Sequence, residues 1–92
     1  MGLFNGAHII VVTAGIEAEM KDKDFASKVM ECLRRHKTGD WGDCCKKDKK
    51  TNNQAIKLKN RIMSVYTIGD VKIWIITEAD RSVTTILFPI EY

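Results

Sequence analysis

The residues best suited to chemistry lie close together near the C-terminal end of the sequence. Two carboxylates and a guanidinium, Glu78, Asp80 and Arg81, fall within four positions, and the hydroxyl of Ser82 follows directly. A guanidinium binds phosphate or carboxylate groups in a fork geometry, so these four residues form a candidate site for an anionic ligand or a protein partner. The alternative is a structural turn, in which Asp80 and Ser82 cap the backbone and Arg81 pairs with Glu78 or Asp40. The segment holds no adjacent nucleophile–base pair, so we predict no catalytic residues and no enzymatic activity.

A second candidate site is the loop at residues 39–43, Gly-Asp-Trp-Gly-Asp. Its Asp40 and Trp41 would contact a ligand or a partner if the loop presents them to solvent. The alternative is that Trp41 packs on the core and that Asp43 caps a helix running from residue 44 to about residue 57.

Positive charge is concentrated between Lys46 and Arg61, a segment with seven basic residues and one acidic residue. The segment carries +6, so the rest of the chain carries −3 of the total charge of +3. Such a patch can neutralise phosphates, and we predict nucleic-acid contacts at Lys46, Lys47, Lys50 and Lys57. A solvated helix face and a surface for an acidic protein partner remain open as alternatives. The side chains available among the charges to read bases are amides, Asn52, Asn53 and Gln54.

Four potential zinc ligands occur in two pairs, Cys32 with His36 and Cys44 with Cys45. Their spacing matches no common zinc module, and a cysteine is often a small buried apolar residue, so we predict no metal and no cofactor. Three cysteines, two of them adjacent, make a poor disulfide framework and favour a reducing, cytoplasmic compartment. No stretch approaches the roughly 20 apolar residues that span a bilayer, and the opening run is typical of a strand rather than a signal peptide, so we expect no membrane partner.

Two helices are predicted to follow a first strand at residues 8–13, a continuous β-branched run. Asp22 or Asp24 can cap the first helix, and Gly39 is a natural stop. One face of this helix is apolar at helical spacing: Phe25, Val29, Cys32, Leu33 and His36. The second helix, at residues 44–57, has a thin apolar stripe, so tertiary contacts must hold it, and its Asp48 and Asn52 can form an inward polar network.

Three strands are predicted after Asn60, at residues 61–68, 71–77 and 83–88. The Gly69-Asp70 turn favours a hairpin in which Ile68 faces Val71. Both faces of the segment 71–77 are apolar, which is typical of a central strand. The sequence therefore predicts one α+β domain, residues 1–92, in the order β-α-α-β-β-β, with a C-terminal antiparallel meander and the helices packed on one face.

Several sequence patterns occur together in the last two thirds of the chain: GDWGD at 39–43, IMSVY at 62–66, KIWIITEADRS at 72–82, TTILFP at 84–89 and EY at 91–92. In these patterns the chain resembles a family of short bacterial plasmid and mobile-element proteins, often labelled "plasmid-related protein" or "type I restriction endonuclease subunit M". The resemblance covers roughly residues 35–92 well and the first third of the chain loosely. A modification subunit needs a doubly wound sheet, a glycine-rich cofactor loop and an Asn/Asp-Pro-Pro-aromatic motif, which 92 residues with one proline do not hold. The resemblance thus implies a genomic context, including restriction–modification, and no mechanism.

These observations lead to two hypotheses of function. The first is a non-enzymatic accessory protein of a mobile element that binds an anionic partner, nucleic acid or a nucleotide. The second is a protein-binding inhibitor or adaptor of a host or defence complex, with the residue 78–82 turn as its contact surface. The relatives carry acidic residues where this chain has Lys46 and Lys47, so the basic segment is not implied by the resemblance. The oligomeric state is not predicted.

Overall fold

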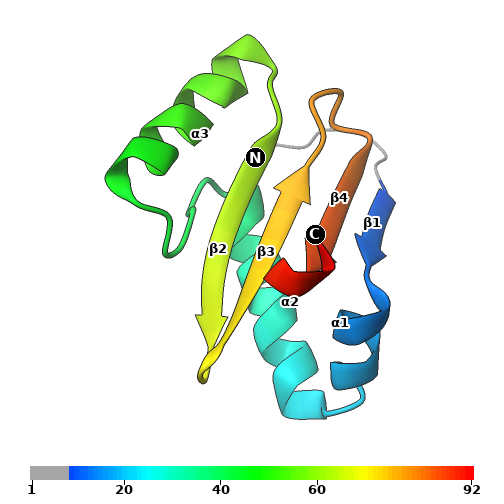
Figure 1. Cartoon of the computed structure of the whole chain (residues 1–92). Coiled ribbons are helices and arrows are strands. Elements are labelled where there is room, and N and C mark those ends of the chain that lie inside the picture. The colour runs from blue at the N-terminus through cyan, green and yellow to red at the C-terminus, as the bar shows by residue number, and fades with distance from the viewer. Residues whose placement is uncertain (1–8) are drawn as a thin grey trace.

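The chain folds around a four-stranded mixed sheet in a computed structural model that describes residues 9–92 (Figure 1). The elements follow one another as β1 (Ile9–Val12), α1 (Ala14–Glu19), α2 (Lys23–Lys37), α3 (Lys46–Leu58), β2 (Ile62–Ile68), β3 (Val71–Thr77), β4 (Val83–Leu87) and the 3-10 turn η1 (Pro89–Glu91). The strand order is β1-β4-β3-β2. No helix within the described residues is long and apolar enough to cross a membrane.

The predicted α+β class, element order and C-terminal meander are confirmed. Ile68 lies opposite Val71, and β3 is a central strand between β2 and β4. The predicted first strand is present as β1, but the sequence did not predict its partner: β1 pairs parallel with β4 from Ile9 opposite Val83 onward. The predicted first strand also included His8, which lies outside the described residues.

α2 packs on one face of the sheet, behind the strands in Figure 1. Asp22 caps it, as predicted, by accepting hydrogen bonds from the backbone N–H groups of Asp24 and Phe25 at 2.9 and 3.3 Å. Its predicted apolar stripe is buried from Val29 to His36. The side chains of this stripe and of the facing strand positions form the main core, of which the buried members are Ile16, Val29, Cys32, Leu33, Tyr66, Ile68, Ile73, Ile75 and Ile86.

α3 begins at Lys46, so the prediction of a helix start at Cys44 with Asp43 as its cap was wrong. The reason is that the loop before α3 runs beside β2. Gly42 forms a parallel bridge with Val65, and the backbone N–H of Asp43 donates to the Val65 carbonyl at 2.6 Å. The Asp43 carboxylate then accepts a hydrogen bond from the Thr67 hydroxyl at 2.6 Å instead of capping the helix.

The outer edge of β2 is closed by this loop and by one side chain of α3. The amide of Asn52 donates to the Met63 carbonyl at 2.6 Å and accepts from the Met63 N–H at 3.2 Å. Asn52 therefore replaces the two backbone hydrogen bonds that a further strand would make at this position. A second apolar cluster fills the space between α3 and β2, with Trp41, Cys44, Ala55 and Ile62.

The opposite face of the sheet, which we call the front face, is covered by η1 over part of its area (Figure 1). Residues paired across neighbouring strands point to the same face, so the register assigns its side chains. They are Ile9 and Val11 from β1, Met63, Val65 and Thr67 from β2, Lys72, Trp74 and Ile76 from β3, and Val83, Thr85 and Leu87 from β4. Ile76 and Leu87 are buried, whereas Met63, Val65, Trp74 and Thr85 keep part of their surface exposed.

Candidate functional site

The predicted turn site at residues 78–82 is organised around Arg81, which has a left-handed backbone with φ of 63°. Its guanidinium donates to the carbonyl oxygens of Asn60 at 2.7 Å, Ala55 at 3.1 Å and Glu78 at 3.1 Å. Two of these carbonyls, those of Ala55 and Asn60, belong to the end of α3 and the residues after it, and the Ala55 carbonyl also accepts from the backbone N–H groups of Lys59 and Asn60. Arg81 therefore joins the β3–β4 turn to the C-terminal end of α3.

The other members of this predicted site contact different partners. The Asp80 carboxylate accepts hydrogen bonds from the hydroxyl and the backbone N–H of Ser82 at 2.6 and 3.0 Å. This is the arrangement expected if Asp80 and Ser82 form a structural turn. These bonds, led by the one from the hydroxyl, lower the pKa of Asp80. The Glu78 carboxylate lies 3.8 Å from the Nε atom of Arg61, so its cationic neighbour is Arg61 rather than Arg81.

Asp40 is held by the C-terminal end of α2. Its carboxylate accepts two hydrogen bonds from Arg35, at 2.7 and 3.2 Å, and one from the Gly42 N–H at 3.1 Å. The Arg35 guanidinium holds the pKa of Asp40 below its usual range. The same guanidinium lies over the ring of Tyr66, whose hydroxyl donates to the Asp40 carbonyl at 2.7 Å. Burial raises the pKa of Tyr66 well above that of a free phenol.

Trp41 packs on the core, with 3% of its surface exposed. Its indole N–H donates to the Asn53 side chain at 2.8 Å, and its ring meets the His36 ring edge to face at 5.8 Å. The structure thus gives Asp40 and Trp41 partners in α2, α3 and β2, while residues 78–82 contact the far end of α3. The two predicted groups do not share partners.

A buried polar chain runs from α2 into the sheet, and sequence reasoning did not find it. The His36 ring nitrogens lie 2.5 Å from the Ser64 hydroxyl and 2.8 Å from the Thr77 hydroxyl. Thr77 in turn lies 2.8 Å from the Thr84 hydroxyl. All four side chains have no exposed surface, so the Ser64–His36 pair, although within hydrogen-bond reach, has no access to a substrate. The sequence did contain a sign of this chain, because the predicted hairpin register places the hydroxyl residues Ser64 and Thr77 on the same face of the sheet.

The cysteines that the sequence offered as potential zinc ligands lie in different surroundings. Cys32 lies in the main core and Cys44 in the cluster under α3, and burial raises the pKa of both thiols. Cys45 is exposed. Among residues 9–92, no three His, Cys, Asp or Glu side chains gather closely enough to hold a metal ion.

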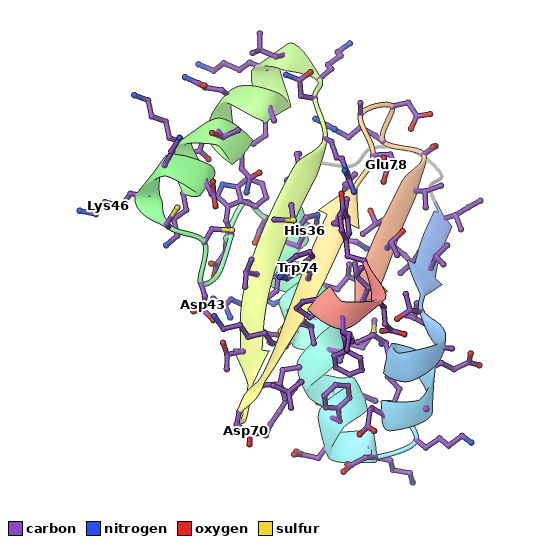
Figure 2. The ribbon with its side chains drawn as sticks, in the orientation of Figure 1. His36, Asp43, Lys46, Asp70, Trp74 and Glu78 are labelled. Atoms are coloured by element: carbon purple, nitrogen blue, oxygen red, sulfur yellow. The ribbon has the colours of Figure 1, made fainter. Side chains whose placement is uncertain are left out.

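The four lysines predicted to contact nucleic acid lie on an exposed helix at one corner of the molecule (Figure 1). α3 carries five lysines and one aspartate, a net charge of +4. At 100° per residue, Lys46, Lys50 and Lys57 share one side of the helix, opposite the buried Asn52 and Ala55. Lys47 flanks this stripe on the adjoining side, and Figure 2 shows Lys46 projecting away from the sheet.

None of these lysines has an acidic partner among the ion pairs of residues 9–92. The pairs there join Lys28 with Asp24, Arg34 with Glu31, Arg35 with Asp40 and Arg61 with Glu78. The α3 lysines are therefore available to external anions. A cleft of about 210 Å³ lies between α3 and β2, on the side of the helix away from this stripe, and is lined by Asp48, Thr51, Asn52, Arg61 and Met63.

Comparison with known proteins adds no relative, since no family model, curated protein or solved structure matches the chain.

Proposed function

We propose that this protein is a non-enzymatic module that binds nucleic acid through the lysine face of α3. The observation that carries the proposal is the exposed stripe of Lys46, Lys50 and Lys57, flanked by Lys47, without an internal acidic partner in the described structure. Lysine is a compact charge on a flexible stem, which suits contacts to phosphates rather than recognition of base edges. The expected mode is electrostatic and largely independent of sequence.

The shape of the lysine face favours a polymer over a free nucleotide. α3 has 13 residues and is about 20 Å long at 1.5 Å per residue. Its lysines lie along a convex surface, whereas a small ligand is usually held in a concave pocket by converging groups. A row of phosphates along a strand fits such a surface better than one phosphate group does. The role as an accessory protein of a mobile element rests on the resemblance of residues 35–92 alone.

A matched pair of charge reversals tests the proposal. In Lys46→Glu/Lys50→Glu, the first residue of α3 and a lysine of the stripe are reversed. In the control, Lys23→Glu/Lys21→Glu, the first residue of α2 and an exposed neighbour are reversed, with the same change in net charge. Both variants place an acid at a helix N-terminus, where it is tolerated.

We expect the α3 variant to bind DNA or RNA at least tenfold more weakly at low salt. The variant should lose about two phosphate contacts. The slope of its log affinity against log salt concentration should therefore be shallower by about 1.4 to 1.8. The control should change affinity by less than about threefold. Fluorescence anisotropy with labelled oligonucleotides measures both quantities. Equal losses in the two variants, or no binding by the wild type at tens of micromolar protein, would overturn the proposal.

A second candidate function is protein binding, and the observation that favours it is the edge strand β1. Ile9, Ile10 and Val11 are exposed there, and β1 pairs with one strand, β4, in the described sheet. An apolar strand edge accepts an added strand from a partner. Reversal of the α3 lysines leaves this edge unchanged, so a partner held at β1 should bind the variant Lys46→Glu/Lys50→Glu as well as the wild type.

A further inference from the structure

The front face of the sheet carries a cluster of aromatic and guanidinium side chains that has no role in the phosphate contacts proposed for α3. Trp74 lies in the middle of β3, partly exposed, and its indole meets the ring of Tyr92 edge to face at 5.5 Å. Tyr92 is 68% exposed. The Arg61 guanidinium lies 5.4 Å from the centre of the Tyr92 ring and donates to its hydroxyl at 3.0 Å. An indole, a phenol and a guanidinium thus form one cluster at the surface.

The position of this cluster links it to α3. Arg61 also lines the cleft between β2 and α3, together with Met63 of the front face. The cleft therefore runs from the aromatic cluster to the side of α3 formed by Asp48, Thr51 and Asn52, and the lysine stripe lies on the outer side of the same helix. On the other side, Lys72 lies on the front face two positions before Trp74. Positive side chains thus occur on both sides of an apolar, aromatic surface.

We infer that the front face stacks the bases of single-stranded nucleic acid on Trp74, Tyr92 and Arg61 while the α3 lysines contact the phosphates. This inference rests on the proposed function and names its substrate class. Stacking on aromatic and guanidinium planes needs unpaired bases, because a duplex keeps its base faces covered. The charge pattern agrees with a strand that crosses the sheet from α3 toward Lys72.

The variants Tyr92→Leu and Trp74→Leu/Tyr92→Leu test the inference, because leucine keeps an apolar side chain but removes the stacking surface. The matched control is Tyr92→Phe, which keeps the ring and loses the hydrogen bond from Arg61. The probes are a fluorescein-labelled single strand of twelve thymidines and a labelled duplex of twelve base pairs. Since Tyr92 is largely exposed, Tyr92→Leu should fold even if the double variant does not, and thermal unfolding checks this.

We expect Tyr92→Leu to lower the affinity for the single strand about fivefold or more, and the double variant to lower it further. Duplex affinity should change less than twofold, and Tyr92→Phe should stay within twofold of the wild type on both probes. Binding of the single strand should also quench Trp74 fluorescence.

Two other outcomes separate the inference from the proposed function. If the α3 charge reversals weaken binding but Tyr92→Leu leaves single-strand affinity unchanged, the inference is overturned and the proposed function stands. If the wild type binds neither probe, both are overturned. A change of oligomeric state in the leucine variants, with single-strand affinity intact, would assign the front face to a second copy and also overturn the inference.

Discussion

At the scale of single residues, the polar side chains that looked most suited to ligand binding are used to connect parts of the fold. Arg81 contacts backbone carbonyls of four residues, and Asp40 receives the guanidinium of Arg35. A sequence shows that such groups are near one another along the chain, but it does not show which distant backbone groups they contact. That is why the turn at Asp80 and Ser82 could be predicted as an alternative and the true partners of Arg81 could not.

The Arg35–Asp40 pair predicts a specific pH dependence of stability. Arg35 lowers the pKa of Asp40 in the folded protein, so the folded state binds its proton less readily than the unfolded state does. The stabilisation is therefore complete above the ordinary aspartate pKa, near 3.8, and is lost as pH falls through the lower folded value. Asp40→Asn should be less stable than the wild type at pH 6, and the difference should shrink toward pH 2.

Urea unfolding of the two proteins at several pH values between 6 and 2 measures this difference. Other carboxylates with lowered pKa values, those of Glu31, Asp80 and Glu91, act equally in both proteins and cancel in the comparison. Both partners of the pair are partly exposed, so added salt should reduce the effect. A stability difference that stays constant with pH would contradict the assignment.

At the scale of elements, α3 has few apolar contacts and depends on polar ones. Its thin apolar stripe predicted this from the sequence, and Asn52 was expected to face inward. The hairpin of β2 and β3 was predictable because alternation and Gly69 act locally, within about fifteen residues. The helix start was not, because the backbone of Asp43 pairs with Val65, a residue far along the chain. Local sequence patterns thus predicted the elements themselves, whereas a long-range backbone contact determined where α3 begins.

Asn52→Ala tests how α3 is held. The substitution leaves the N–H and C=O of Met63 without the side-chain partner described above, at the edge of the sheet. We expect a loss of about 1–3 kcal/mol in the free energy of unfolding, the usual cost of a buried polar group without its partner. Gln54→Ala, two positions further along α3 and exposed, should change stability by less than about 0.5 kcal/mol.

Chemical denaturation measures both losses, and hydrogen exchange of the Met63 amide reports the bond directly. If Asn52→Ala and Gln54→Ala lose the same stability, the Asn52 amide does not close the edge of β2.

At the scale of the whole molecule, the two ends of the sheet differ. β2 is closed by a loop and a helix, whereas β1 shows Ile9, Ile10 and Val11 at its edge. Flat apolar edges promote association with other strands. The α+β class and the meander were predicted from the sequence, but the parallel partner of β1 was not, because the chain offers several strands and the choice depends on the complete sheet.

Val11→Lys tests the open edge, with Val71→Lys as a matched control. Val11 is 42% exposed and Val71 39%, but Val71 lies at the β2–β3 turn, away from β1. We expect Val11→Lys to reduce concentration-dependent association, measured by sedimentation velocity from micromolar to millimolar protein. Val71→Lys, which adds the same charge, should leave association as in the wild type. Equal effects of the two substitutions would mean that net charge, and not the edge, controls association.

The parallel pairing of β1 with β4 has a consequence for how the chain acquires its structure. The side chain of Glu91 accepts hydrogen bonds from Thr13, 78 positions earlier, and from the N–H of Gly15. Loop closure over such a separation is slow compared with forming α2 or the β2–β3 hairpin. Until residues 83–91 are in place, β1 has no strand partner in the described sheet, and the main core lacks Ile86. β1 can therefore join the sheet only after β4 has been synthesised, more than seventy residues later in the chain.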